Sequence, residues 1–149
     1  MRLLRAIIGG ACGSATHTRL MWVKTRFDVL PEFQPYNDLQ RTLASTIKTV
    51  VPQSLLWTMA FLNDALVLSF IFHKTYSILP GHSWVAKGLV FGIIAWVFMG
   101  MVFFPLIGEG LFAFGVDQGA LPALFSLVML LVYASTLSAI YSGLHREPS

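Results

Sequence analysis

The stretch GLVFGIIAWVFMGMVFFPLIG, residues 88–108, decides the fold, because its 21 residues carry no charge. It lies between Lys87 and Glu109, the nearest charged residues on either side. About 20 apolar residues in a helix cross the hydrocarbon core of a bilayer, which is about 30 Å thick. A helix that is apolar all round must be surrounded by protein or by lipid. The stretch therefore predicts a membrane-spanning helix over about residues 84–107, and the other segments are expected to pack beside it.

The composition is that of a membrane protein rather than of a water-soluble one. Of the 149 residues, 56% are hydrophobic and only 11% are charged, whereas soluble domains carry about 25% charged residues. The single cysteine, Cys12, excludes an intramolecular disulfide and a multi-cysteine metal site. The net charge of +3 is spread along the chain without a dense basic cluster, which argues against nucleic-acid binding. We therefore expect a single membrane domain over residues 1–149.

Three further apolar segments predict membrane-spanning helices at about residues 4–24, 51–74 and 121–144. Together with residues 84–107 they predict an all-α integral membrane protein with four transmembrane helices. The start of the chain also has the basic and then apolar order of a signal peptide. No clear cleavage site followed by a soluble domain is present in the sequence, so we favour a first transmembrane helix there.

A polar segment separates the first two predicted spans. Leu39, Leu43, Ile47 and Val50 recur at spacings of four and three, which places them on one face of a helix. They predict a short amphipathic helix at the membrane surface over about residues 38–49. The alternative is that the same residues form the first turns of the second span.

Small residues are spaced along the predicted spans so that two helices can approach closely. They form GxxxG pairs in the first and third spans and recur at spacings of three and four in the last. The predicted helix-packing positions are Gly9, Gly13, Gly88, Gly92, Gly100, Ser135, Ala139 and Gly143. Because a minimal four-helix bundle needs fewer such positions, the excess favours packing against a partner protein or a second copy.

Four polar residues inside predicted spans are the candidate buried polar groups: Asn63, Asp64, His17 and Arg19. Asp64 is near the centre of its span, where an ionised carboxylate is costly unless it is paired or neutralised. Such an acid can relay protons or bind a cation, or it can be a protonated packing group beside Asn63. We favour the packing role, because no second acid is placed at matching depth. By helix rise, Arg19 lies too near the far interface for an easy direct pair with Asp64.

A second group of polar and aromatic residues flanks the spans, where we expect the membrane–water interface. These residues are His73, Lys74, His82, Trp84, Lys87, Glu109 and Asp117. A transmembrane b-type haem needs two histidines that face each other at similar depth. His17 and His73 are predicted near opposite faces of the bilayer, so we expect no cofactor. A haem or quinone contact is kept as an alternative.

The sequence lacks the common catalytic motifs. It contains no GxSxG elbow, no GxxxxGK[ST] phosphate loop, no HExxH pair and no cysteine cluster. We therefore predict no metal site, no catalytic residues and no enzymatic activity.

The second half of the chain has a recognisable pattern. A Leu-Pro-Gly and then a Lys-Gly pair lead into the third predicted helix, and a Pro-Leu followed by glycines ends it. The matching positions are Leu79, Pro80, Gly81, Lys87, Gly88, Pro105, Leu106, Gly108 and Gly110. This pattern resembles a family of small bacterial inner-membrane proteins with four spans and no assigned function. The resemblance implies the fold and a bacterial inner-membrane location, and it implies no reaction.

These features predict a non-catalytic accessory or assembly subunit that packs against a larger bacterial membrane complex. An electron-transport complex, respiratory or photosynthetic, is the expected host, because such complexes are abundant and collect small helical subunits. The expected partners are membrane lipids and larger subunits or a second copy. The first alternative is a small proton- or ion-coupled transporter or channel that uses Asp64. The second alternative is a redox subunit that binds quinone or haem.

The charges also give a weak indication of orientation. An even number of spans places both termini on one side of the membrane. The loop that holds Glu109 and Asp117 has no basic residue and is therefore expected outside the cell. We accordingly expect both termini in the cytoplasm.

Overall fold

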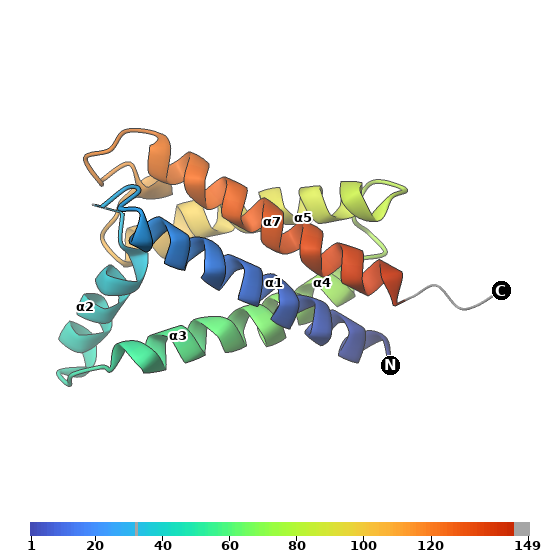
Figure 1. Cartoon of the computed structure of the whole chain (residues 1–149), viewed down its shortest axis with the longest axis horizontal. Coiled ribbons are helices and arrows are strands. Elements are labelled where there is room, and N and C mark those ends of the chain that lie inside the picture. Colours follow the sequence, from blue (N-terminus) through green and yellow to red (C-terminus); the bar gives the residue numbers. More distant parts are fainter. Residues whose placement is uncertain (32, 145–149) are drawn as a thin grey trace.

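The computed structural model describes residues 1–31 and 33–144, and every regular element among them is a helix (Figure 1). In chain order the elements are α1 (Arg2–Arg26), α2 (Pro35–Ile47), α3 (Gln53–Leu62), η1 (Asn63–Leu68), α4 (Ser69–Thr75), α5 (Trp84–Phe98), η2 (Met99–Phe103), α6 (Phe104–Leu106), η3 (Leu111–Ala113) and α7 (Leu121–Gly143). The segments η1 and η2 are π-helical, and η3 is a short 3₁₀ turn. The prediction of an all-α chain is therefore confirmed.

Three long helical segments have the length and apolar composition needed to cross a membrane. They are Gln53–Thr75, Trp84–Leu106 and Leu121–Gly143. The first two are each a continuous rod in which a π-helical segment joins two α-helices. These three segments coincide with the second, third and fourth predicted spans.

The first predicted span, residues 4–24, requires a correction. Helix α1 is 25 residues long, which is enough to cross a bilayer, but it is not among the helices apolar enough to do so. Glycine, serine, threonine and histidine residues, together with Arg19, replace the large apolar side chains that favour a helix in lipid. The prediction of four apolar spans is therefore wrong, and the composition supports three.

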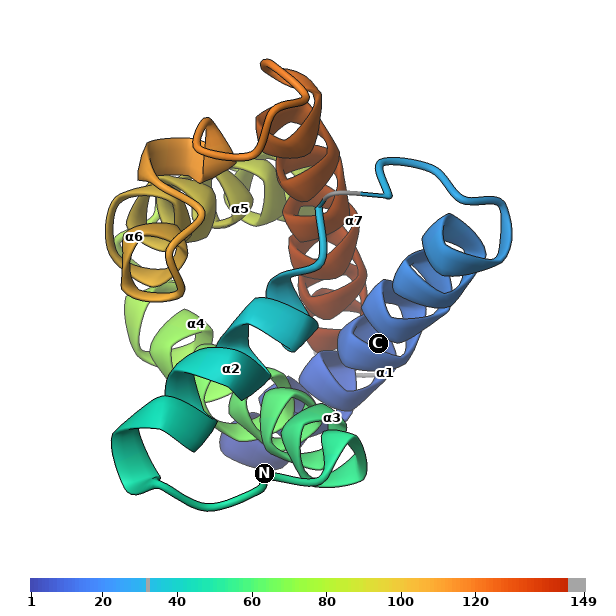
Figure 2. The same cartoon turned by 90° about the vertical axis from the view of Figure 1, so that its left-hand side faces the viewer.

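The long segments run alternately in opposite directions, so that the N-terminus and the end of α7 lie at the same end of the bundle (Figure 1). Helix α7 packs against α1 on one side and α5 on another, and α1 also packs against η1 and α4. Seen end-on, α5, α7, α1 and α3 follow one another around an arc (Figure 2). Buried aromatic and apolar side chains fill its centre: Ala6, Phe72, Phe91, Tyr133, Leu137 and Tyr141.

Helix α2 lies across the end of the bundle away from the termini (Figure 2). It begins at Pro35, a residue well suited to a first helical turn because it has no N–H to leave unpaired. It ends at Ile47, because Lys48 adopts a left-handed conformation with φ of 52°, and helix resumes only at Gln53. The predicted separate amphipathic helix is therefore present, and the alternative of first turns of the second span is wrong.

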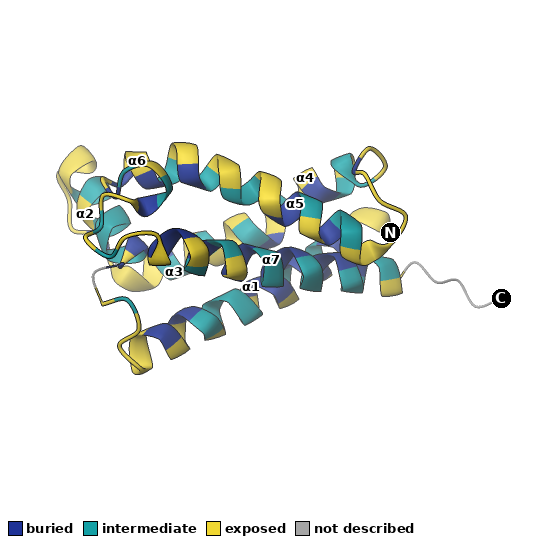
Figure 3. Ribbon diagram, turned by 90° about the horizontal axis from the view of Figure 1, so that it is seen from above, coloured by how far each residue is buried: buried dark blue, intermediate teal, exposed yellow. Residues whose placement is uncertain are grey.

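The outer sides of the long helices are exposed (Figure 3), and they carry many large apolar side chains. Exposed side chains on these helices include Phe61, Val67, Phe70, Ile94, Phe98, Met101 and Val128. Apolar surface of this extent is unfavourable in water and is suited to lipid or to a neighbouring membrane protein. The surface and the three apolar helices together fit a membrane protein.

Candidate functional site

The small residues of α1 face α7 rather than the outside of the bundle. A Cβ atom built on Gly13 would lie 2.8 Å from the ring of Tyr133, and one on Gly9 would lie 2.9 Å from the carbonyl oxygen of Leu137. Such separations leave no room for a side chain. The backbones of α1 and α7 therefore depend on glycine at both positions.

Helix α5 makes a similar contact with another side of α7. A Cβ atom on Gly88 would lie 3.0 Å from the Cβ of Ser138 and 3.2 Å from the Cα of Ser135. One on Gly92 would lie 3.2 Å from the Cβ of Ala134. The GxxxG pair of the third segment therefore serves a contact within this chain.

The remaining small residues have different surroundings. Gly100 lies against the ring of Phe112, Ala139 is half-buried, and Gly143 has open space around it. Most of the predicted packing positions are thus used inside the bundle. Their number no longer argues for a partner protein.

The candidate functional site is a cluster of polar side chains at the midpoint of Gln53–Thr75. Asp64, the second residue of η1, faces α1. Its Oδ2 atom is 3.5 Å from the hydroxyl of Ser14 and 3.7 Å from Nδ1 of His17. Its Oδ1 atom is 3.4 Å from the amide nitrogen of Asn63. We call these four residues, Asp64, His17, Ser14 and Asn63, the polar seam.

Three helices hold the polar seam in place. The hydroxyls of Tyr133 on α7 and Ser69 on α4 both donate to the carbonyl oxygen of Asp64, at 2.6 Å and 3.3 Å. Gly10 of α1 lies directly against Ser69, where any Cβ atom would overlap the serine hydroxyl. The two hydroxyls thus bond to a backbone carbonyl within the π-helical segment η1, where the regular α-helical hydrogen-bond pattern is interrupted. Short π-helical segments of this kind occur frequently at functional sites.

The polar seam is only partly covered. The side chains of Asp64 and His17 are 16% and 17% exposed, and Asn63 is exposed. Carboxylate, imidazole and amide groups at mid-span are unfavourable against hydrocarbon. The outer side of the seam is therefore poorly suited to lipid alone.

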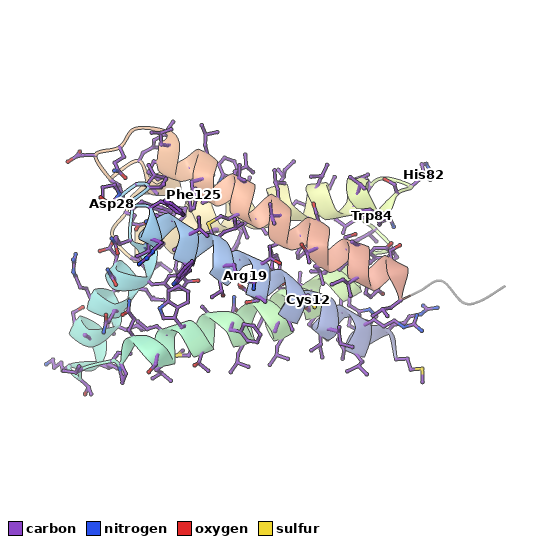
Figure 4. The ribbon with its side chains drawn as sticks, viewed as in Figure 1. Cys12, Arg19, Asp28, His82, Trp84 and Phe125 are labelled. Atoms are coloured by element: carbon purple, nitrogen blue, oxygen red, sulfur yellow. The ribbon has the colours of Figure 1, made fainter. Side chains whose placement is uncertain are left out.

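Sequence reasoning missed the approach of His17 to Asp64. It considered Arg19 as the cation able to reach Asp64 and placed His17 toward an interface. In the structure Arg19 is exposed on the outside of α1, along which Cys12 also lies (Figure 4). Arg19 forms no ion pair with any acid of residues 1–31 and 33–144. The spacing of Ser14 and His17, three residues apart, was the available signal that both share one helix face.

Most of the residues predicted at the interface lie near the ends of the long helices. The ammonium group of Lys87 donates to the carbonyl of Tyr76 at 2.7 Å and lies 4.2 Å from the centre of its ring. His73 Nδ1 is 3.0 Å from the hydroxyl of Tyr141. Figure 4 shows His82 and Trp84 at the end opposite Asp28. The exposed members of the set are Lys74, His82, Trp84 and Asp117.

Glu109 is the exception, because the structure buries it. Its side chain is only 2% exposed, and neither carboxyl oxygen has a regular hydrogen bond to the residues that are described. Burial, and then the neighbouring Asp38 carboxyl, raise the pKa of Glu109 to about 8, against the opposing charge of Lys24. Within the described ranges, no three His, Cys, Asp or Glu side chains are grouped so that they could hold a metal ion.

These observations define the class of protein: over residues 1–31 and 33–144 it is all-helical, with three helices long and apolar enough to cross a membrane and a polar seam between α1 and η1. All 149 residues match the model of the "Family of unknown function (DUF6789)", and the chain belongs to this family. The family description names no location, source organism or activity. No curated protein and no solved structure matches the chain.

Proposed function

We propose that the protein is a non-catalytic subunit that packs against a larger membrane complex, with the polar seam at the contact. The observation that carries this proposal is the exposure of Asn63 at mid-span, with Asp64 and His17 partly exposed beside it. A neighbouring helix that offers polar groups at the same depth would satisfy these side chains, whereas lipid would not.

The position of α1 supports the same proposal. Helix α1 packs along α7, η1 and α4 and so lies beside the apolar spans, although it is itself more polar. We infer that α1 crosses the membrane together with them as a fourth helix, with partner protein covering part of its outer face. Arg19 on that face would then pair with an acidic group of the partner.

The proposed setting is the bacterial inner membrane, with an electron-transport complex as host. The choice of host rests on the abundance of such complexes and their many small helical subunits. The N-terminus and the end of α7 lie at the same end of the bundle (Figure 1). This arrangement supports both termini on one side of the membrane, and we propose that this side is the cytoplasm. The proposal assigns the chain no reaction.

Site-specific photo-crosslinking tests the contact. A photo-reactive amino acid at position 63 should give a protein adduct of one defined mass in native membranes. The same group at position 128, an exposed apolar site on α7, serves as the matched control and should give lipid adducts. Asn63→Leu should then reduce co-purification of the crosslinked protein without lowering the thermal stability of the isolated chain.

Three results would decide against this proposal. Lipid adducts alone at position 63, or full retention of the partner by Asn63→Leu, would show that the seam is not a protein contact. An adduct with a second copy of this chain would replace the larger complex with a homo-oligomer.

A second candidate function is supported by the chemistry of the seam itself. The Asp64 carboxylate has an imidazole at 3.7 Å and a hydroxyl at 3.5 Å, so that a proton can be held by either Asp64 or His17. We propose, as the alternative, a proton- or ion-coupled transporter or channel in which these two residues bind the transported ion.

Two substitutions of Asp64 separate the alternatives. Asp64→Asn keeps the size and hydrogen-bonding capacity of the side chain but removes its ionisation. A packing role predicts that Asp64→Asn leaves stability and assembly almost unchanged, whereas Asp64→Leu weakens both. Proton flux through wild-type protein in liposomes, abolished in folded Asp64→Asn, would favour transport instead.

A further inference from the structure

Helix α2 crosses one end of the bundle (Figure 2). A second group of charged side chains, Glu109, Lys24 and Asp38, lies at this end. Glu109 comes from the turn after α6, Lys24 from the last turn of α1, and Asp38 from the first turn of α2. Lys24 is 4% exposed and Glu109 is 2% exposed. Asp38 is partly exposed, at 21% of its side chain, and it neighbours the buried Glu109. Three elements that are distant in sequence therefore bring a buried acid and a buried base close to a second acid.

Hydrogen bonds to two other segments fix the backbone at Glu109. Its N–H donates to the carbonyl of Phe104 at 3.0 Å, and its carbonyl accepts from the N–H of Gly115 at 2.8 Å. A Cβ atom on Gly115 would lie 2.6 Å from that carbonyl oxygen, so only glycine permits the contact. Phe104 is fully buried in an apolar cluster with Phe33 and Ile107.

The neighbours of Glu109 favour one protonation state of its carboxyl group. Both of its oxygens are buried without a regular hydrogen bond among the described residues, and the Asp38 carboxyl interacts with it. Two ionised carboxylates under an apolar cover repel, but one proton between them provides a donor and an acceptor. Arg41 donates to Asp38 Oδ1 at 3.1 Å, so Asp38 already has a hydrogen-bond donor, whereas the Glu109 carboxyl has none among the described residues.

We propose that Glu109 and Asp38 form a binding site for one proton, which holds the first turn of α2 against the end of the bundle. With the proton bound, the Glu109 hydroxyl donates to the Asp38 carboxylate. Without it, two negative charges face each other and α2 loosens. Lys24 faces Glu109 and partly offsets that negative charge, and Asp28 in turn acts on Lys24.

The titration of Glu109 agrees with this geometry. Burial first, and the Asp38 carboxyl second, raise the pKa of Glu109 to about 8, while Lys24 lowers it. The proton is therefore bound at neutral pH and is released in mildly alkaline solution. This site is separate from the polar seam, and its test does not depend on the proposed function.

Infrared difference spectroscopy of the full chain in lipid nanodiscs detects the proton directly. In the wild-type protein, a carbonyl stretch of a protonated carboxylic acid should disappear with a midpoint near pH 8. Glu109→Gln should lack this component. Asp117→Asn, which alters an exposed acid in the same connection, should retain it. A wild-type component that persists in Glu109→Gln would overturn the assignment.

A spin label on α2 measures whether this helix loosens when the proton is released. Cys12→Ser removes the single native cysteine, and Ser45→Cys introduces a label at an exposed position of α2. Label mobility should rise above about pH 8 in otherwise wild-type protein. Glu109→Gln should abolish the pH dependence, because its amide can donate to Asp38 without titrating. Asp38→Asn should shift the midpoint to lower pH, because it removes the neighbouring negative charge.

Two outcomes of the labelling experiment would contradict the proposal. The first is a mobility that does not change with pH in the protein that retains Glu109. The second is an equal change in Glu109→Gln, which would assign the transition to another group.

Discussion

Gly13→Ala tests the close contact between α1 and α7. The added Cβ atom would lie 2.8 Å from Cδ2 of Tyr133 and 3.0 Å from both Cε2 and the carbonyl oxygen of that residue. The Tyr133 side chain is 1% exposed and is enclosed by the core, so it has little space in which to move aside. The substitution must therefore separate the two helices or displace the ring.

The expected loss of stability follows from three contributions. Overpacking of a well-packed core costs about 1–3 kcal/mol. Displacing the ring also weakens the 2.6 Å hydrogen bond from the Tyr133 hydroxyl to the Asp64 carbonyl, and a bond of this kind contributes about 0.5–1.5 kcal/mol. The better helix propensity of alanine offsets about 1 kcal/mol of this loss. We expect the free energy of unfolding to fall by about 0.5–3.5 kcal/mol in total.

Reversible unfolding in mixed detergent micelles, followed by circular dichroism, measures this change. Gly143→Ala is the matched control, because no atom lies within 4 Å of the Cβ it would add. That control should be as stable as the wild-type protein or more stable, since only the gain in helix propensity remains. Equal stability of Gly13→Ala and Gly143→Ala would refute the close contact and the reasoning based on it.

Three further predictions concern the ends of the bundle. Ser83→Ala removes the N-terminal cap of α5, in which the serine oxygen accepts from the N–H of Ala86 at 3.1 Å. The substitution should lower the free energy of unfolding by about 1 kcal/mol, and an unchanged denaturation midpoint would contradict the capping role of Ser83. Lys87→Met removes the 2.7 Å hydrogen bond to the carbonyl of Tyr76 and the cation over its ring. The free energy of unfolding should fall by about 1–2 kcal/mol in the same assay, and an unchanged value would show that neither contact contributes to stability. The free energy of unfolding of the wild type, relative to that of Glu109→Gln, should fall as pH rises from the ordinary carboxyl pKa of 4.5 to about 8, because folded Glu109 holds its proton more tightly than the unfolded chain does. Unfolding curves at several pH values measure this difference, and a constant value would refute the raised pKa.

The apolar spans could be predicted from the sequence because length and hydropathy alone determine whether a helix suits a bilayer. The sequence indicated residues 51–74, 84–107 and 121–144, and the structure has helices Gln53–Thr75, Trp84–Leu106 and Leu121–Gly143 there. Helix α1 was harder to classify, because its glycines and Arg19 lower its hydropathy without preventing a long helix. Its length was predictable, but its suitability for lipid was overestimated.

The candidate site was predictable only in part. Asp64 and Asn63 were indicated because polar residues at mid-span are unusual. The approach of His17 was not, because it depends on how α1 is rotated and shifted along its axis relative to η1. Those two quantities are set by tertiary contacts, such as the one between Gly10 and Ser69, and no local pattern specifies them.

The burial of Glu109 could not be predicted from its neighbours. A glycine-rich segment with two acids is typical of an exposed connection, and glycines at positions 108 and 110 were compatible with that interpretation. In the structure both adopt positive φ angles, of 86° and 77°, which turn the chain back on itself. Glu109 lies between these two glycines and is buried, close to Lys24 and Asp38.

The small residues along α7 determine what a partner of this protein would have to offer. Helices α1 and α5 already occupy two sides of α7, and their glycines make the close contacts there. A partner could not use those surfaces without displacing α1 or α5. The outer surface of the three apolar spans is largely apolar, with a polar interruption at mid-span formed by Asn63 and Asp64 beside His17 of α1. In the proposed assembly, a partner helix is therefore selected by hydrogen bonding at one depth rather than by small-residue packing along its length.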